Sequence, residues 1–214
     1  MIVQKLLDWF DQNVTQLHID VNAVRDKLIE IGVQDEIEFH FVKMDKDKVR
    51  GLLYRYTTHS APYAHPTFHS RIIIPREMGE ESEAWQRLVA VKELLHITDC
   101  DRLTAASPEA VNNLFEKFSI PPELRTADED EPFGGSFLND RVRIYFALAV
   151  LVPAKPRDKL RELFAAKVLT AREIAEIAAI PVRYVRHVLD DDFEALIGTL
   201  IKWEISEQPD AHAA

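Results

Sequence analysis

Within the first hundred residues, the spacing of apolar residues changes from helical to strand-like and back, which limits the fold to the α+β class. The first 32 residues place apolar side chains at helical spacing in two stretches, and Gly32 stands where a glycine commonly ends a helix. Three β-rich runs follow, at residues 37–42, 52–56 and 71–74, the last closed by Pro75. We expect two opening helices and then a small three-stranded, mainly antiparallel sheet packed on helices.

The next helical stretch, residues 83–97, contains the segment Lys92-Glu93-Leu94-Leu95-His96. In an H-E-x-x-H helix, two histidines at positions i and i+4 bind one Zn²⁺ and the glutamate polarises the metal-bound water. Here Lys92 occupies the first position, and a protonated ammonium has no lone pair for a metal. A Glu-x-x-His pair alone is weak evidence, because an apolar helix acquires one by chance.

Two further helices are expected before the C-terminal region. Residues 110–118 have a helical pattern, and residues 141–152 form a strongly apolar helix that stops at Pro153. Between them, residues 128–131 are acidic, and Pro132, Gly134 and Gly135 follow. This segment predicts a solvated loop.

The C-terminal part of the chain is its basic part, since residues 155–187 hold eight Lys or Arg against four Asp or Glu. Thr170 is a good cap for a helix over 171–178, and Pro181 is a good start for a second helix ending at 189. The pair predicts a helix-turn-helix shape in which Arg183 and Arg186 could contact nucleic acid. A simple packing unit fits better than a DNA reader, because short helical pairs are common, the turn has no glycine and three aspartates follow at 190–192.

The helix ending at Pro153 adds a second motif. Residues 140–153 have an acid at the first position, Phe146-Ala147 in the middle and the closing proline. With the segment at 92–96, this order resembles the ImmA/IrrE-type, zincin-like metallopeptidases, whose second helix follows the pattern E-x-x-A-N-x-F-A-x-x-L-L-M-P. Arg143-Ile144 replaces the Ala-Asn pair, and the resemblance spans residues 37–190.

The resemblance implies a zincin-like fold with a zinc site. Glu93 matches the general base, His96 and Asp140 match two zinc ligands, and Lys92 stands at the place of the missing histidine. It also implies a partner, because family members commonly act on or pair with helix-turn-helix repressors in stress responses and mobile elements. With one ligand replaced, we expect the chain to hold no cofactor, or zinc if the site is active.

Lys92 invites a physical hypothesis of its own. If the helices pack as in a zincin, the ammonium of Lys92 supplies the positive charge that Glu93 and Asp140 would otherwise lack. The alternative is that Lys92 extends along the helix to solvent.

Four histidines are further candidate metal ligands. His59, His65 and His69, together with His96, are a candidate accessory set for Zn²⁺ or Ni²⁺, although their spacing also fits an irregular surface loop. The single cysteine, Cys100, excludes a disulfide framework and any cysteine-rich zinc module. Any metal would therefore depend on His, Asp and Glu.

Composition limits the class of protein. With 214 residues, 47% of them hydrophobic, the chain can bury a full core, and it has no apolar run of membrane-spanning length or signal-peptide pattern. We expect a soluble, cytoplasmic protein with no membrane partner, divided into residues 1–153, a helical region 154–206 and a disordered tail 207–214. The net charge of −10 opposes non-specific binding of nucleic acid.

Three functions follow from these residues. The first is a catalytically inactive, regulatory protein that binds a protein partner, such as a helix-turn-helix repressor, on a peptidase-like scaffold. The second is a metal-dependent endopeptidase with an altered ligand set. The third is a DNA-binding regulator that uses Arg183 and Arg186.

Overall fold

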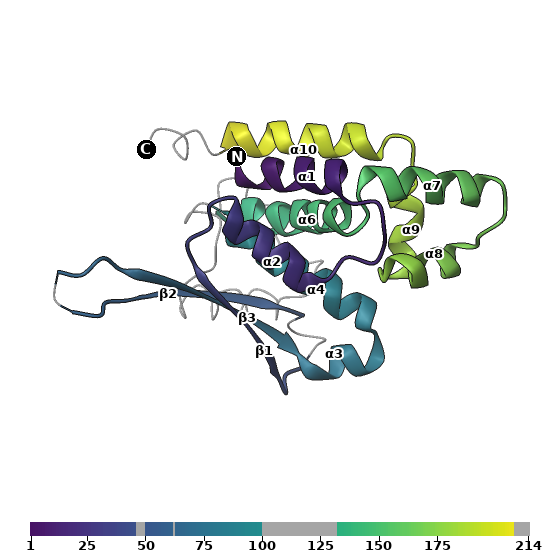
Figure 1. The fold of residues 1–214 in the computed structure, drawn as a ribbon. Coiled ribbons are helices and arrows are strands. Elements are labelled where there is room, and N and C mark those ends of the chain that lie inside the picture. Colours follow the sequence, from purple (N-terminus) through teal and green to yellow (C-terminus); the bar gives the residue numbers. More distant parts are fainter. Residues whose placement is uncertain (46–49, 62, 100–131, 208–214) are drawn as a thin grey trace.

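The computed structural model describes residues 1–45, 50–61, 63–99 and 132–207 as an α+β protein. A three-stranded sheet lies beneath a layer of helices (Figure 1). The two opening helices are α1 (Ile2–Asn13) and α2 (Val21–Glu30), as predicted, and Gly32 follows with φ +122°. That left-handed backbone is costly for residues other than glycine, which explains the glycine at the end of the second helix.

The sheet contains β1 (Glu36–Val42), β2 (Leu52–Thr58) and β3 (Thr67–Pro75) in the order β1-β3-β2. β1 runs parallel to β3, whereas β2 runs antiparallel to it. The prediction of a mainly antiparallel sheet is therefore wrong: the sheet is mixed, because the first strand pairs with the third rather than with its neighbour in sequence. The third strand also begins at Thr67, four residues earlier than predicted, since its polar start pairs with the end of β2.

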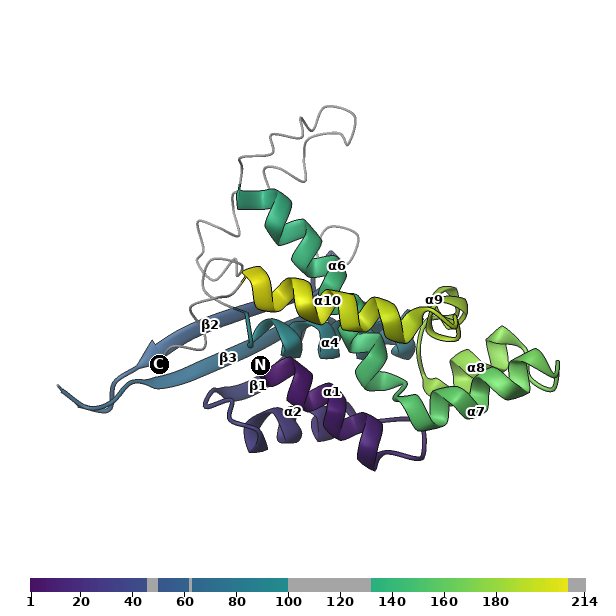
Figure 2. The same cartoon turned by 90° about the horizontal axis from the view of Figure 1, so that it is seen from above.

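One face of the sheet is buried against the helices. Alternate residues of the central strand, Ser70, Ile72 and Ile74, are buried, and Leu53 of β2 lies in the same core. The opposite face is more exposed, which is the usual alternation of a sheet covered on one side. In both cartoon views the end of the β2–β3 hairpin extends beyond the helices (Figures 1 and 2).

A short helix, α3 (Arg76–Glu81), leads into α4 (Glu83–His96), the predicted central helix. The hydroxyl of Ser82 accepts a hydrogen bond from the Trp85 backbone N–H and caps α4. α4 packs against β3, β2 and α2, and most extensively against α6 (Pro132–Leu151). This contact positions the candidate site.

α6 is longer than predicted, because it begins at Pro132 rather than at residue 141 and includes Gly134 and Gly135. The prediction of a loop at these three residues is wrong. Proline is well accepted in the first turn of a helix, so it marks a start here rather than a break. The helix predicted at 110–118 and the acidic residues 128–131 lie outside the described residues.

Four helices complete the described chain: α7 (Ala154–Ala165), α8 (Ala171–Ala178), α9 (Val182–Val188) and α10 (Phe193–Glu207). The two predicted short helices, α8 and α9, are present with nearly the predicted bounds. α6 packs against both α1 and α10. The predicted tail lies outside the described residues except for Glu207, which ends α10. None of the helices within the described ranges is long and apolar enough to cross a membrane.

Candidate functional site

The contact between α4 and α6 brings together four residues singled out in the sequence. Lys92 Nζ lies 2.5 Å from Asp140 Oδ1 and 2.8 Å from Glu93 Oε1. His96, one helical turn after Lys92, has its Nε2 atom 3.5 Å from the same Asp140 oxygen. The Lys92 side chain is only 12% exposed, so it does not extend to solvent. We call Lys92, Glu93, His96 and Asp140 the α4–α6 site.

The charges of the α4–α6 site stabilise one another. Burial alone would lower the pKa of Lys92, but attraction to Glu93 and Asp140 outweighs burial and raises this pKa well above its usual value. Burial would likewise raise the pKa of Asp140, yet His96 and Lys92 hold it well below its usual value. The lysine therefore remains an ammonium and Asp140 a carboxylate over the whole physiological pH range.

This arrangement does not fit a zinc ion. A zinc site built on the family positions would need lone pairs from residue 92, His96 and Asp140, and the ammonium of Lys92 has none. It also contacts the carboxylates that would face the metal. Among the residues that the structure describes, no group of three or more His, Cys, Asp or Glu is arranged to hold a metal ion.

His96 is oriented by a residue that the sequence analysis missed. Its Nδ1 atom lies 2.6 Å from Oδ2 of Asp99, whose side chain is fully buried. Burial alone would lower the pKa of His96, but the carboxylates of Asp140 and Asp99 raise it above its usual value. A carboxylate on one imidazole nitrogen is also the usual support of a metal-binding histidine. The sequence signal that could have identified Asp99 is its position, three residues after the candidate site residue His96.

Glu93 is enclosed as well as paired. Its side chain is 5% exposed, and the Gly51 backbone, immediately before β2, lies against it. A Cβ atom at Gly51 would be 2.6 Å from Glu93 Oε1 and 2.5 Å from Val89 Cγ1, closer than any real Cβ contact. The Glu93 carboxylate, which the resemblance to ImmA/IrrE-type proteins predicts to be a general base, is thus covered on this side by main chain and contacts the ammonium of Lys92.

A second missed group continues from Asp99. Arg143 of α6 is 0% exposed and forms ion pairs with Asp99 and with Glu204 of α10. Its Nη2 donates to Glu204 Oε1 at 2.7 Å and its Nη1 to Oε2 at 3.3 Å. Burial raises the pKa of Glu204, and the positive charge of Arg143 opposes that rise. The sequence signal for this group is an arginine, Arg143, at the start of the apolar part of α6. A guanidinium buried there needs carboxylate partners.

The accessory histidines do not join the α4–α6 site. His69 lies in β3, on the face opposite the buried Ser70 and Ile72, where its ring stacks on Tyr56. Its Nε2 contacts Thr58 Oγ1 at 2.8 Å, and its Nδ1 lies 3.3 Å from Glu36 Oε2. His59 and His65 lie in the hairpin connection that extends away from α4 (Figure 1).

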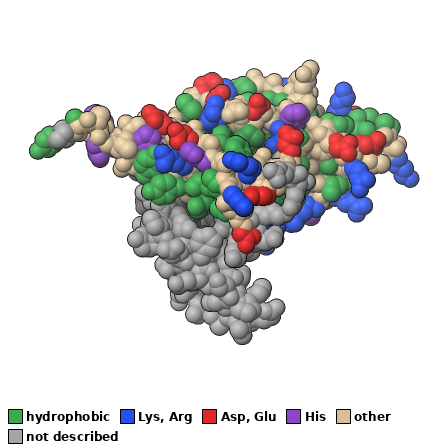
Figure 3. All heavy atoms as spheres, turned by 90° about the horizontal axis from the view of Figure 1, so that it is seen from below, with side chains coloured by type: hydrophobic (Ala, Val, Ile, Leu, Met, Phe, Trp, Pro, Cys, Tyr) green, Lys and Arg blue, Asp and Glu red, His purple; other side chains and the backbone are tan. Residues whose placement is uncertain are grey.

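The space-filling view from below shows histidine side chains gathered toward the hairpin (Figure 3). The predicted set of three histidines around His96 is therefore not formed. The sheet separates His69 from α4, and the hairpin holds the other two beyond the helical layer. The single cysteine, Cys100, lies outside the described residues.

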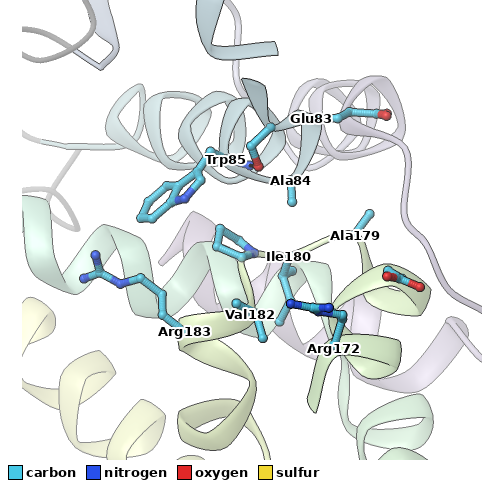
Figure 4. Close-up of a pocket in the computed structure, with 12 residues that line it drawn as sticks. Glu83, Ala84, Trp85, Arg172, Ala179, Ile180, Val182 and Arg183 are labelled. Atoms are coloured by element: carbon cyan, nitrogen blue, oxygen red, sulfur yellow. Dashed lines mark hydrogen bonds between the residues drawn. The ribbon is translucent and has the colours of Figure 1, made fainter. Parts of the chain in front are cut away.

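The two arginines proposed for nucleic-acid contact differ in their surroundings. The guanidinium of Arg183 lies over the rings of Trp85, at 5.3 Å, and Tyr184, at 4.8 Å. Its side chain points toward Trp85 at one end of a pocket of about 530 Å³, between the start of α4 and the α8–α9 turn (Figure 4). Arg183 and Arg186 are both exposed on α9. The α8–α9 unit thus packs on α4 through one of its two candidate arginines.

Arg87 of α4 also contacts the α8–α9 unit, through a hydrogen bond at the end of α8. Its guanidinium donates to the backbone carbonyls of Ile19 and Ala179. Burial is the main cause that lowers the pKa of Arg87. Ala179 ends α8 with φ +49° and ψ +48°, a left-handed conformation at the position where a glycine is usual.

No protein-family model, curated protein or solved structure matches this chain. What the described residues define is an α+β protein with a mixed three-stranded sheet and a buried ionic site between α4 and α6. The relation to ImmA/IrrE-type proteins stays a prediction based on the two motifs.

Proposed function

We propose that the chain is a catalytically inactive, zincin-like protein of the ImmA/IrrE type that binds a partner protein rather than cleaving it. The single observation that supports this is the position of the Lys92 ammonium, between Asp140 and Glu93. It supplies within the protein the positive charge that a metal supplies in an active enzyme. A helix-turn-helix repressor is the partner that the resemblance implies, and a cytoplasmic location would suit it.

Two alternatives are less favoured. A metal-dependent endopeptidase would need a substitute for the ligand lost at Lys92, and His59, His65 and His69 lie away from α4. A DNA-binding regulator would use Arg183 and Arg186, which are both exposed, but the Arg183 guanidinium already lies over the ring of Trp85. A duplex would also meet three aspartates at 190–192, whose charge repels phosphate.

The test is the zinc content of protein purified without a metal column, followed by zinc titration and a matched Lys92→His variant. We expect the wild-type chain to contain and take up no zinc. Lys92→His restores two histidines at i and i+4 and should bind zinc through residues 92, 96 and 140. About one zinc per wild-type chain, the content of a site with one catalytic metal, would contradict the proposal and favour the peptidase.

A second measurement separates the partner classes. Purified helix-turn-helix repressors are incubated with the chain, and complex formation and cleavage are followed by size-exclusion chromatography and mass spectrometry. We expect retention of an intact repressor. A salt-sensitive shift of duplex DNA that is lost in Arg186→Gln would instead support the DNA-binding alternative.

A further inference from the structure

Charged side chains of alternating sign connect the C-terminal helix to the α4–α6 site. Glu204 of α10 pairs with Arg143 of α6, Arg143 pairs with Asp99, and Asp99 contacts His96 Nδ1. On its other side, His96 faces Asp140, which pairs with Lys92. We call the first part of this series, Glu204–Arg143–Asp99, the relay.

The relay is buried along its whole length. Arg143 is fully buried, and Asp99 and Glu204 are nearly so. Water does not screen charges at such positions, so each ion depends on its neighbours for compensation. Within the described part of the chain, one carboxylate oxygen of Asp99 faces Arg143 and the other faces His96. A change in the contact between Arg143 and Asp99 therefore alters the contact between Asp99 and His96.

The partners of Arg143 come from distant parts of the chain. Glu204 is 61 positions away and lies in the last helix that the structure describes. If its charge is removed, Arg143 keeps Asp99 as its carboxylate partner within the described residues. Asp99 is then drawn toward the guanidinium, and its hydrogen bond to the imidazole lengthens.

We propose that Asp99, Arg143 and Glu204 are positioning residues for His96. Through Glu204, α10 then contributes to the geometry of the α4–α6 site. The docking of α10 sets the orientation in which His96 faces Asp140. Coupling between two sites is reciprocal. A partner protein that contacts His96 or Asp140 should therefore change how strongly α10 is bound to α6. This last consequence rests on the proposed function, whereas the relay itself does not.

The test compares two substitutions in the same helix. Glu204→Gln removes the charge that holds Arg143, and Glu194→Gln removes the α10 charge that pairs with Arg157 at 2.8 Å, outside the relay. The ring ¹H and ¹⁵N signals of His96 and hydrogen exchange of residues 94–99 are measured in both variants.

Glu204→Gln should move the His96 Nδ1–H signal and speed exchange at residues 94–99, and Glu194→Gln should do neither. A merely structural role for Glu204 would loosen α10 without moving the imidazole signal. An unchanged His96 signal in Glu204→Gln, or an equal change in both variants, would overturn the proposal.

A second variant keeps the test decisive if Glu204→Gln folds poorly. Arg143→Lys keeps a positive charge between Asp99 and Glu204 but removes the forked geometry of the guanidinium. The relay predicts that the His96 signal also moves in this variant, and an unmoved signal contradicts it. Zinc binding by the wild-type chain would contradict the proposed function and leave this result unaffected.

Discussion

The α4–α6 site and the α8–α9 pair are held together in different ways. In the α4–α6 site, the stabilising contacts join charges from helices distant in the sequence, such as Lys92 with Asp140. In the α8–α9 pair, local signals set the structure, as when Thr170 and Glu173 cap each other's backbone N–H groups. The α4–α6 site therefore depends on charge compensation and the α8–α9 pair on the capping of helix ends, so substitutions should destabilise them by different amounts.

The largest effect is expected from Arg143→Leu. It leaves Asp99 and Glu204 buried without the guanidinium, and removing one partner of a buried ion pair typically costs about 3–5 kcal/mol. Chemical denaturation measures the loss. Arg25→Leu is the control, because Arg25 pairs with its exposed neighbour Asp26 and its loss should cost under about 1 kcal/mol. Similar losses for both would contradict our account of the relay.

Lys92→Ala should be the next most damaging. It exposes Glu93 to the like charge of Asp140, and we expect a loss of about 3 kcal/mol, the lower end of the range for buried pairs. The lower end applies because the Asp140 side chain is 45% exposed and water compensates part of its charge. Lys5→Ala, on the exposed face of α1, is the matched control. A melting temperature equal to that of the wild type would show that Lys92 is not needed for charge compensation.

Gly51→Ala tests how tightly the backbone covers Glu93. The added methyl group would overlap Val89 and Glu93, and overpacking of this kind costs about 1–3 kcal/mol. Gly198→Ala is the opposite control, because nothing lies within 4 Å of its added Cβ and alanine favours a helix. The melting temperature should fall in Gly51→Ala and rise in Gly198→Ala. An unchanged melting temperature in Gly51→Ala would mean that the backbone at residue 51 can shift away from Glu93.

Thr170→Ala should have a smaller effect, because it removes one cap of α8. Loss of a side-chain cap typically costs about 1 kcal/mol. The change should destabilise α8 and α9 without moving the His96 signal, and far-ultraviolet circular dichroism during denaturation measures it. A loss as large as that of Lys92→Ala would mean that the α8–α9 pair is not governed by local signals.

Ala179→Gly is the smallest change and has the opposite sign. A left-handed conformation costs an alanine roughly 1 kcal/mol more than a glycine, and the greater freedom of unfolded glycine offsets part of that gain. We expect a slight increase in stability in the same denaturation experiment. A decrease would indicate that the Ala179 methyl group makes contacts worth more than the backbone strain.

Local patterns predicted much of the fold. Helical spacing identified α4 and the capping threonine identified α8, because both signals act between residues close in sequence. The pairing of β1 with β3 was missed because strand order depends on how the whole chain folds back. The start of α6 was missed because a proline followed by two glycines is also typical of loops.

The candidate site was predictable only in part. The two motifs identified Lys92, Glu93, His96 and Asp140, which the structure brings together. Asp99, Arg143 and Glu204 were missed, since no sequence spacing relates a residue of α10 to one of α6. His69 was considered as a ligand beside His96 or as part of an irregular loop, whereas it belongs to β3 and lies on the face of the sheet opposite Ser70.

The mixed sheet also has a consequence for the order of folding. β2 and β3 form a hairpin whose closest paired residues, Thr58 and Thr67, are near neighbours in sequence, so their contacts close a short loop. β1 meets β3 across a much longer stretch of chain, as with Glu38 and Arg71, which are 33 positions apart. Because closing a longer loop is slower and entropically more demanding, we expect the hairpin to form before β1 joins it. β1 would then be the last strand to dock.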